Sequence, residues 1–225
     1  MLNNLTFPKL FRAIIVVFAI ILSVTVNVAQ ADDFDKIVSR FKDEMGISDE
    51  KAERFIYEVQ NTVFELQKHL TNIASHETSK DEKRKLIATT IGEFFINGFD
   101  SSVQTATIEN PRVKSFMAKT YLDRLSKLSD YYDTVEVLFD KDYLSMGSIE
   151  EFRDDNKKIA YNFEVKMWQM FKGCNREGTS CYTDYTQKGV NFIFKQEMGS
   201  WKLQVKVITA KKPIPFREGV WKSDD

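Results

Sequence analysis

Apolar and polar side chains alternate along three stretches in the last third of the chain, residues 161–172, 182–196 and 201–209. Alternation with a period of two is typical of a strand with one face on a core and the other in water. The short connections favour antiparallel pairing of neighbours. The pattern predicts a three-stranded meander, whose core face includes Tyr161, Phe163, Val165, Met167, Phe171, Trp201, Leu203, Val205 and Val207.

Two residues interrupt the polar face of the first of these strands. Trp168 and Met170 stand where the alternation calls for polar side chains. An apolar patch that stays exposed marks a contact site for a partner or ligand. We therefore predict a binding surface of Trp168 and Met170, with Phe192 or Trp201 nearby. The alternative is that the N-terminal helices cover these side chains and make them part of the core.

The N-terminal half is patterned for helices. Residues 33–45 and 49–74 carry apolar side chains at spacings of three and four, which is typical of amphipathic helices. The stripe of the second segment predicts a long helix packed on its own chain, although it could also form a coiled-coil seam. The stripe consists of Ala52, Phe55, Ile56, Val59, Val63, Leu66, Leu70 and Ile73.

The middle of the chain alternates helix and strand signals. Ser79 and Glu82 have the spacing of a capping box, which predicts a helix start, and Asn97-Gly98 predicts its end. Residues 99–109 favour a strand. Pro111 is interpreted as the first turn of a further helix, whose apolar stripe is Val113, Phe116, Met117, Tyr121, Leu125 and Leu128.

The rest of the middle segment leads into the meander. Residues 131–140 alternate as a strand, 144–149 could extend it, and 153–157 indicate a turn. Pro213 and Pro215 are expected to end regular pairing, which leaves 213–225 as a C-terminal tail that packs or frays.

The first 31 residues have the pattern of a secretory signal peptide. Lys9 and Arg12 precede an apolar run over 13–22, and residues 29–31, Ala-Gln-Ala, match a cleavage site. An uncleaved membrane anchor is the alternative, but the strongly apolar part is shorter than the roughly 20 residues of a spanning helix, which favours the signal peptide. The pattern predicts an exported protein, periplasmic or secreted, cleaved after Ala31.

Cys174 and Cys181, on either side of a short loop, are the two cysteines of the chain. Export permits a disulfide between them, at the base of a hairpin, and two free thiols are the alternative. The two histidines, His69 and His76, do not complete a zinc set with them, so we predict no metal site.

Composition and charge exclude several classes of function. The formal net charge is −1, which does not favour nucleic-acid binding. The nine glycines are scattered, and the chain has no phosphate-cradling loop, nucleophile elbow or H-E-x-x-H motif. We therefore predict no cofactor.

The order helix, short strand, helix, strand and three long strands over residues 79–212 resembles the nuclear transport factor 2-like superfamily. The segments that carry the resemblance are "FFINGFDSSVQ" (94–104), "VKSFMAKTYLDRLSKL" (113–128), "YYDTVEV" (131–137), "FKGC…CYTDYTQKGVNFIF" (171–194) and "WKLQVKVITA" (201–210). More narrowly, it resembles an exported bacterial branch found in Bacteroidetes. The resemblance implies an α+β fold in which a bent antiparallel sheet wraps around helices as a cone. Residues 32–78 would then form a helical extension before the cone domain, 79–212.

Catalytic members of that superfamily use an Asp, Tyr or His inside the cone. The polar groups expected to face inward here are Tyr121, Asp133, Tyr161 and Gln169, and no histidine follows residue 77. Asp133 is the candidate acid or base, although a solvent-exposed Asp at a strand entry is the alternative interpretation.

The prediction from the sequence is a non-catalytic binding or accessory protein of the cell envelope, not an enzyme. The expected partner is a protein or an apolar small molecule, not nucleic acid, and two copies could pair through the sheet. A periplasmic carrier of a lipid or other apolar molecule and an isomerase or dehydratase are the alternatives. The predicted binding residues are Trp168, Met170, Phe192, Trp201 and Tyr121.

Overall fold

The computed structural model describes residues 36–140, 145–197, 200–211 and 213–215. The predicted leader, 1–31, and most of the predicted tail, 216–225, lie outside the described residues. The chain divides into two compact units, Met1–Glu53 and Arg54–Asp225. In the first unit, residues 36–45 form a helix that ends at Gly46, whose φ of +61° suits a residue without a Cβ. Among the described residues, no helix combines the length and apolar character needed to cross a membrane.

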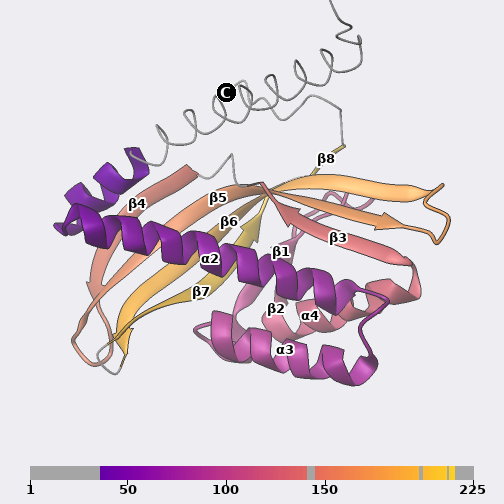
Figure 1. Cartoon of the computed structure of the whole chain (residues 1–225), viewed down its shortest axis with the longest axis horizontal. Coiled ribbons are helices and arrows are strands. Elements are labelled where there is room, and N and C mark those ends of the chain that lie inside the picture. Colours follow the sequence, from indigo (N-terminus) through magenta and orange to yellow (C-terminus); the bar gives the residue numbers. More distant parts are fainter. Residues whose placement is uncertain (1–35, 141–144, 198–199, 212, 216–225) are drawn as a thin grey trace, which may run out of the picture. The chain divides into compact units, whose positions relative to one another are not determined.

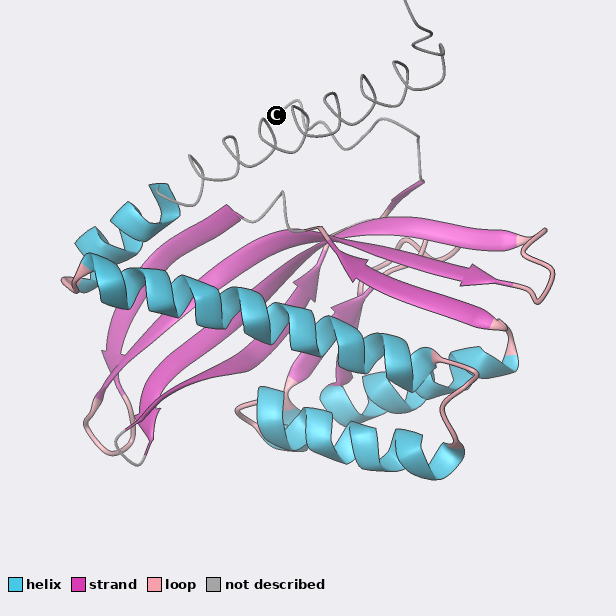
Figure 2. Ribbon diagram, viewed as in Figure 1, coloured by secondary structure: helices cyan, strands magenta, loops and turns pink. Residues whose placement is uncertain are grey.

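The described strands of the second unit form one curved eight-stranded sheet (Figure 1, Figure 2). Its main path runs β2-β1-β7-β6-β5-β3, with β4 paired to β5 and β8 paired to β6. Neighbours pair antiparallel except β1 and β7, which are parallel. The strands are β1 (Ser102–Thr105), β2 (Lys114–Met117), β3 (Thr134–Phe139), β4 (Ser145–Arg153), β5 (Ile159–Cys174), β6 (Cys181–Glu197), β7 (Ser200–Ala210) and β8 (Ile214–Pro215).

The predicted meander is confirmed as β5, β6 and β7. Residues 145–149 do not extend β3 but begin the separate strand β4, which pairs with β5. The predicted turn follows, with Lys157 at a φ of +60°. The tail does not end pairing at Pro213, because Ile214 in β8 pairs with Tyr185 of β6.

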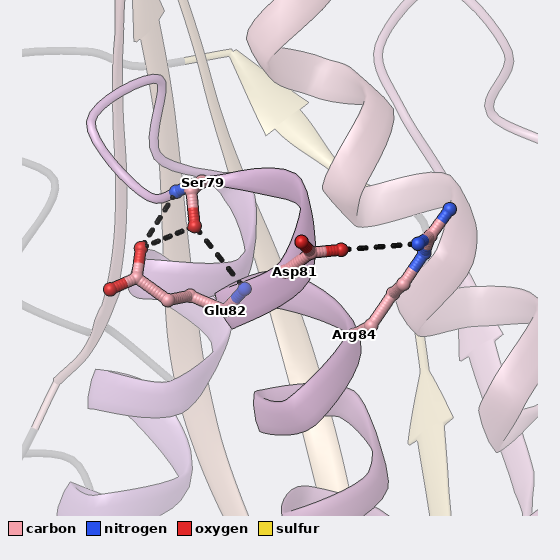
Figure 3. A network of polar contacts seen from close by, with 4 residues as sticks. All are labelled: Ser79, Asp81, Glu82 and Arg84. Carbon is pink, nitrogen blue, oxygen red and sulfur yellow. Dashed lines mark hydrogen bonds and ion pairs between the residues drawn. The ribbon is translucent and has the colours of Figure 1, made fainter.

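Three α-helices accompany the sheet: α2 (Asp49–Ala74), α3 (Lys80–Phe94) and α4 (Ala118–Ser126). Two short 3₁₀ helices, η1 (Gly98–Asp100) and η2 (Lys127–Asp130), follow α3 and α4. The predicted capping box is present at α3 (Figure 3). The Ser79 amide donates to the Glu82 carboxylate at 3.0 Å, and the Glu82 amide donates to the Ser79 hydroxyl at 3.3 Å. The helix ends at Phe94, before the predicted stop at Asn97-Gly98.

The prediction of a helix from Pro111 is wrong for its first part. Residues 114–117 form β2, which pairs with β1, and α4 begins only at Ala118. The Ser102 and Ser115 hydroxyls lie 2.7 Å apart across this pair. Val113 and Met117 are exposed, so the apolar stripe is not buried there. The ladder with β1 satisfies the backbone of this segment, and tertiary pairing overrides its local helical pattern.

The part of α2 from Arg54 onward packs on the inner face of the sheet (Figure 1). The Phe55 ring lies 4.1 Å from that of Phe194. Farther along, the Gln67 side chain accepts from the Phe139 amide at 2.6 Å, and the Thr71 hydroxyl donates to the carbonyl of Val137 at 3.2 Å. The inner face beneath this helix is buried and apolar, and includes Phe163, Val165, Val190, Phe192, Phe194 and Val205.

Candidate functional site

The inner face of β5 and β6 changes from apolar to polar along its length. The register pairs Phe163 with Phe192 and Val165 with Val190, and these pairs lie in the core. Since directly opposed residues share a face of the sheet, the next opposed pairs also face inward. They are Met167 with Lys188, Gln169 with Thr186, Phe171 with Asp184, and Gly173 with Tyr182.

A cavity of about 490 Å³ lies over this polar half. The sheet supplies one wall, and α4 and η2 supply the other. Its size is in the range of small-molecule sites. The polar and aromatic residues that line the cavity include Phe116, Tyr121, Arg124, Lys127, Tyr131, Tyr132, Gln169, Phe171, Tyr182, Asp184, Thr186 and Lys188.

Asp184 is a buried carboxylate in the cavity wall, with 4% of its surface exposed. The Tyr182 hydroxyl donates to its Oδ2 at 2.8 Å, and that hydroxyl accepts from the Ile108 amide at 3.1 Å. Within the described chain, Oδ1 of Asp184 has no hydrogen-bond partner. Burial raises the pKa of Asp184, while the Tyr182 hydroxyl and the charge of Lys188 oppose that shift. Tyr182 thus holds one oxygen of this carboxylate, and no described residue holds the other.

Three further polar groups line the cavity. Neither the Tyr121 hydroxyl nor the side chains of Gln169 and Thr186 have a hydrogen-bond partner among the described residues. Tyr121 is half-buried because the cavity reaches its ring. Its hydroxyl is desolvated all the same, and burial raises the pKa of Tyr121 to about 12. It therefore stays a hydrogen-bond donor at neutral pH.

Lys188 lies on the same face of β6 as Asp184, two inward positions farther along. Four residues of strand place their Cα atoms roughly 13 Å apart. The Lys188 ammonium donates to the Gln104 carbonyl at 2.9 Å, and 4% of the residue is exposed. Burial lowers the pKa of Lys188 to about 8, against the opposing charge of Asp184.

Aromatic rings and two cations lie toward the opposite wall of the cavity. Arg124 of α4 is exposed, and its guanidinium lies 4.7 Å from the centre of the Phe116 ring. Lys127 follows in η2 and is also exposed. Tyr132 lies on Gly173, where an added Cβ would come within 2.7 Å of the ring. The glycine therefore provides the space that this ring occupies.

The Cys174–Cys181 disulfide closes the hairpin end that carries Tyr182, with an S–S distance of 2.04 Å. The Asp133 amide donates to the Cys174 carbonyl at 2.9 Å, which ties the entry of β3 to the same end. The predicted pairing of the cysteines is confirmed, and a disulfide is compatible with export. The cross-link holds the backbone next to Tyr182.

The structure separates the residues that the sequence suggested as one surface. Trp168 and Met170 are half-buried on the outer face of the sheet, and α2 covers the inner one. Phe192 is fully buried in the core. Trp201 lies at the far end of the inner face, where its ring stacks on Phe194 at 4.8 Å. Of the five predicted binding residues, Tyr121 is the one that lines the described cavity.

Only some of the polar groups that the sequence placed inside the cone line the cavity. Gln169 lines the cavity, as Tyr121 does, whereas Tyr161 lies beside Trp201 and Asp133 is exposed. The sequence interpretation missed Tyr182, Asp184 and Lys188. Their signal was available, because they continue the inward positions 190, 192 and 194 at steps of two.

Among the described residues, no group of three or more His, Cys, Asp or Glu side chains is placed to hold a metal ion.

No protein-family model matches the chain, and no curated protein matches its sequence. Solved structures do match the chain, at low sequence identity. Aln2 from a Streptomyces species is 9% identical with a TM-score of 0.41, over 71% of this chain and 91% of that one. ActVI-ORFA from Streptomyces coelicolor is 7% identical with a TM-score of 0.39, over 70% and 97%.

A protein assigned as a scytalone dehydratase, from Novosphingobium aromaticivorans, is 9% identical with a TM-score of 0.36, over 75% of this chain and 95% of that one. The α+β fold that the resemblance implied, a curved and mostly antiparallel sheet with helices on its inner face, is confirmed by the structure.

The prediction that the chain is not an enzyme is corrected. The cavity itself removes the reason for the prediction, since it contains the buried carboxylate of Asp184 and the phenols of Tyr121 and Tyr182. Asp133, the acid or base candidate from the sequence, is exposed and is not among the residues that line the cavity.

Proposed function

We propose that this protein is an enzyme of the isomerase or dehydratase class, which moves protons on a small organic molecule bound in the cavity. The observation that carries the proposal is the Asp184 carboxylate. It is buried in the cavity wall, held through one oxygen by Tyr182, and, among the described residues, without a protein partner at the other. A buried group that is oriented in this way, with a shifted pKa, is typical of a catalytic acid or base.

Asp184 acts as the general base in this scheme. Its Oδ1 takes a proton from a carbon next to a carbonyl group. The electron pair of the broken C–H bond forms a C=C bond, and the π pair of the carbonyl group moves onto its oxygen. The raised pKa makes the carboxylate a stronger base than a solvated one. Return of the proton to another carbon completes an isomerisation, and departure of a β-hydroxyl group as water completes a dehydration.

Tyr121 stabilises the oxyanion that this step creates. Its hydroxyl lines the cavity on α4, opposite the sheet. A phenol with a pKa of about 12 remains protonated, and a donor already desolvated in the cavity needs little reorganisation. The rings of Phe116, Tyr132 and Phe171 favour a flat ligand between the two walls.

We also propose that the enzyme works outside the cytosol. The disulfide beside Tyr182 persists in an oxidising compartment and is reduced in most cytosols. Export through the predicted leader would place the folded chain in such a compartment.

The test is hydrogen–deuterium exchange at carbon. The full chain without residues 1–31 is incubated in heavy water with a panel of ketones and β-hydroxy carbonyl compounds, and proton NMR follows loss of the α-proton signal. We expect exchange with the wild type and a loss of about 10²–10⁴-fold in Asp184→Asn. Asp133→Asn is the matched control, because that carboxylate is exposed and outside the cavity.

Equal rates in Asp184→Asn and the wild type would refute the proposal. So would a panel without exchange together with a protein that retains acyl-chain lipid in native mass spectrometry, the result expected of a carrier.

A further inference from the structure

Within the described chain, the Lys188 ammonium uses only part of its capacity to donate hydrogen bonds. Its ammonium carries three N–H donors, and in the described part of the chain the Gln104 carbonyl is its single hydrogen-bond acceptor. No carboxylate among the described residues lies within ion-pair distance of it. A buried charge that is so little compensated is costly unless the group serves another purpose or gives up its proton.

A second buried lysine in the described chain shows the contrast. The Lys83 ammonium donates to the Ser126 carbonyl at 3.1 Å and to the Ser129 hydroxyl at 2.7 Å, at the end of α4. Lys83 is 6% exposed, close to the 4% of Lys188, but it does not line the cavity. Lys83 therefore joins α3 to α4, whereas Lys188 lines the cavity.

We propose that the Lys188 amine condenses with a carbonyl group of the ligand to form an imine. This goes beyond the proposed proton transfer and rests on it only for the identity of the site. An imine nitrogen, once protonated, withdraws electrons more strongly than a carbonyl oxygen does. The covalent step would thus ease removal of the adjacent proton by Asp184.

The step is balanced without any further reagent. The nitrogen lone pair forms a bond to the carbonyl carbon, and the C–O π pair moves onto oxygen, which gains a proton as nitrogen loses one. The hydroxyl of this carbinolamine then takes a proton from solvent and leaves as water while the nitrogen lone pair forms the C=N bond, which gives the iminium; loss of the remaining N–H proton to solvent gives the neutral imine. Amine and carbonyl compound give imine and water, and solvent supplies the proton of the iminium form.

Burial of Lys188 supports this chemistry. A lysine at the ordinary pKa of 10.5 is about 0.3% amine at pH 8, whereas a lysine with a pKa of about 8 is about half amine. The amine of Lys188 is therefore on the order of a hundredfold more abundant. The charge of Asp184 opposes this lowering of the pKa of Lys188. Tyr182, Tyr121, Arg124, Lys127 and Glu109 line the same cavity. The phenols Tyr131 and Tyr132 lie in the same cavity.

The experiment is reductive trapping. The full chain without residues 1–31 is incubated near pH 8 with para-carboxybenzaldehyde or pyruvate and sodium cyanoborohydride, and the adduct is located by peptide mass spectrometry. The aldehyde suits the aromatic wall and places its carboxylate toward Arg124 and Lys127. We expect labelling of Lys188 at least about tenfold faster than that of Lys83, and loss of this adduct in Lys188→Arg.

Two variants separate this inference from the proposed function. Asp184→Asn should lose proton exchange and keep the Lys188 adduct. Lys188→Arg keeps the charge and removes the nucleophile, and thermal unfolding confirms that it folds. Absence of a Lys188 adduct in the wild type, or labelling that favours Lys83 or the exposed Lys127, overturns the inference. If exchange persists in that case, the proposed function stands without the imine.

Discussion

Replacement of Tyr182 by phenylalanine tests the polar pair at the centre of the site. The change removes the hydroxyl that donates to Oδ2 of Asp184 at 2.8 Å and accepts from the Ile108 amide at 3.1 Å. Because the carboxylate is buried, water replaces that donor poorly. A hydrogen bond to a charged acceptor contributes about 1.5–3 kcal/mol to stability. We expect the free energy of unfolding at neutral pH to fall by that amount.

The pH dependence has a definite sign. Burial places the folded pKa of Asp184 above its unfolded value, so deprotonation destabilises the fold as pH rises through the folded pKa. The Tyr182 hydroxyl opposes that shift, and Tyr182→Phe raises the pKa of Asp184 further. The loss of stability should therefore be largest at neutral pH and shrink at acid pH, where the carboxyl is neutral in both proteins.

The assay is urea unfolding at a series of pH values, with a ¹³C NMR titration of the Asp184 carboxyl. For a chain of this size, the loss corresponds to a fall in Tm of about 3–12 °C. Tyr185→Phe is the matched control. Its hydroxyl lies on the outer face of the same strand and donates to the Met170 sulfur at 3.1 Å, so the pKa of Asp184 should not change. An unchanged or lower pKa of Asp184 in Tyr182→Phe would refute the assignment of this pair.

Two further predictions concern the frame of the site. Reduction of the Cys174–Cys181 disulfide, whose cysteines are 7 residues apart, should lower the free energy of unfolding by about 2.5 kcal/mol in the chain-entropy model. A Cys174→Ser/Cys181→Ser variant should match the reduced wild type, and an unchanged Tm in both would contradict the prediction. Phe192→Ala, which removes a fully buried ring 5.6 Å from that of Phe163, should cost about 3–5 kcal/mol in urea unfolding. A stable Phe192→Ala protein that fails to bind ligand would instead assign Phe192 to the site.

Local patterns predicted the elements that depend on local chemistry. The capping box at Ser79 is formed by neighbours in the chain, so its geometry follows from residue types three positions apart. The long strands β5, β6 and β7 follow from period-two alternation over many residues. Residues 114–117 form a strand instead, since only the partner β1 distinguishes that outcome from a helix.

The site was harder to predict because its residues are brought together by register. Asp184 and Lys188 are polar residues in an alternating strand, and the sequence gives them the same inward parity as Phe192 and Phe194. No local sequence pattern distinguishes an inward position that a helix covers from an inward position that lines the cavity. That difference depends on where α2 and α4 lie over the sheet.

The amino-acid sequence by itself determined the capped helix that begins after Ser79, the meander and the cysteine pair, because propensity, periodicity and short loops act between near neighbours. The tertiary structure alone decided which half of the inner face is packed and which half is a cavity. It also decided that the buried carboxylate of Asp184 lies in the wall of that cavity. Those facts depend on where α4 and the segment before β2 lie over β6. These elements are distant in sequence and come together only when the sheet curves around its helices.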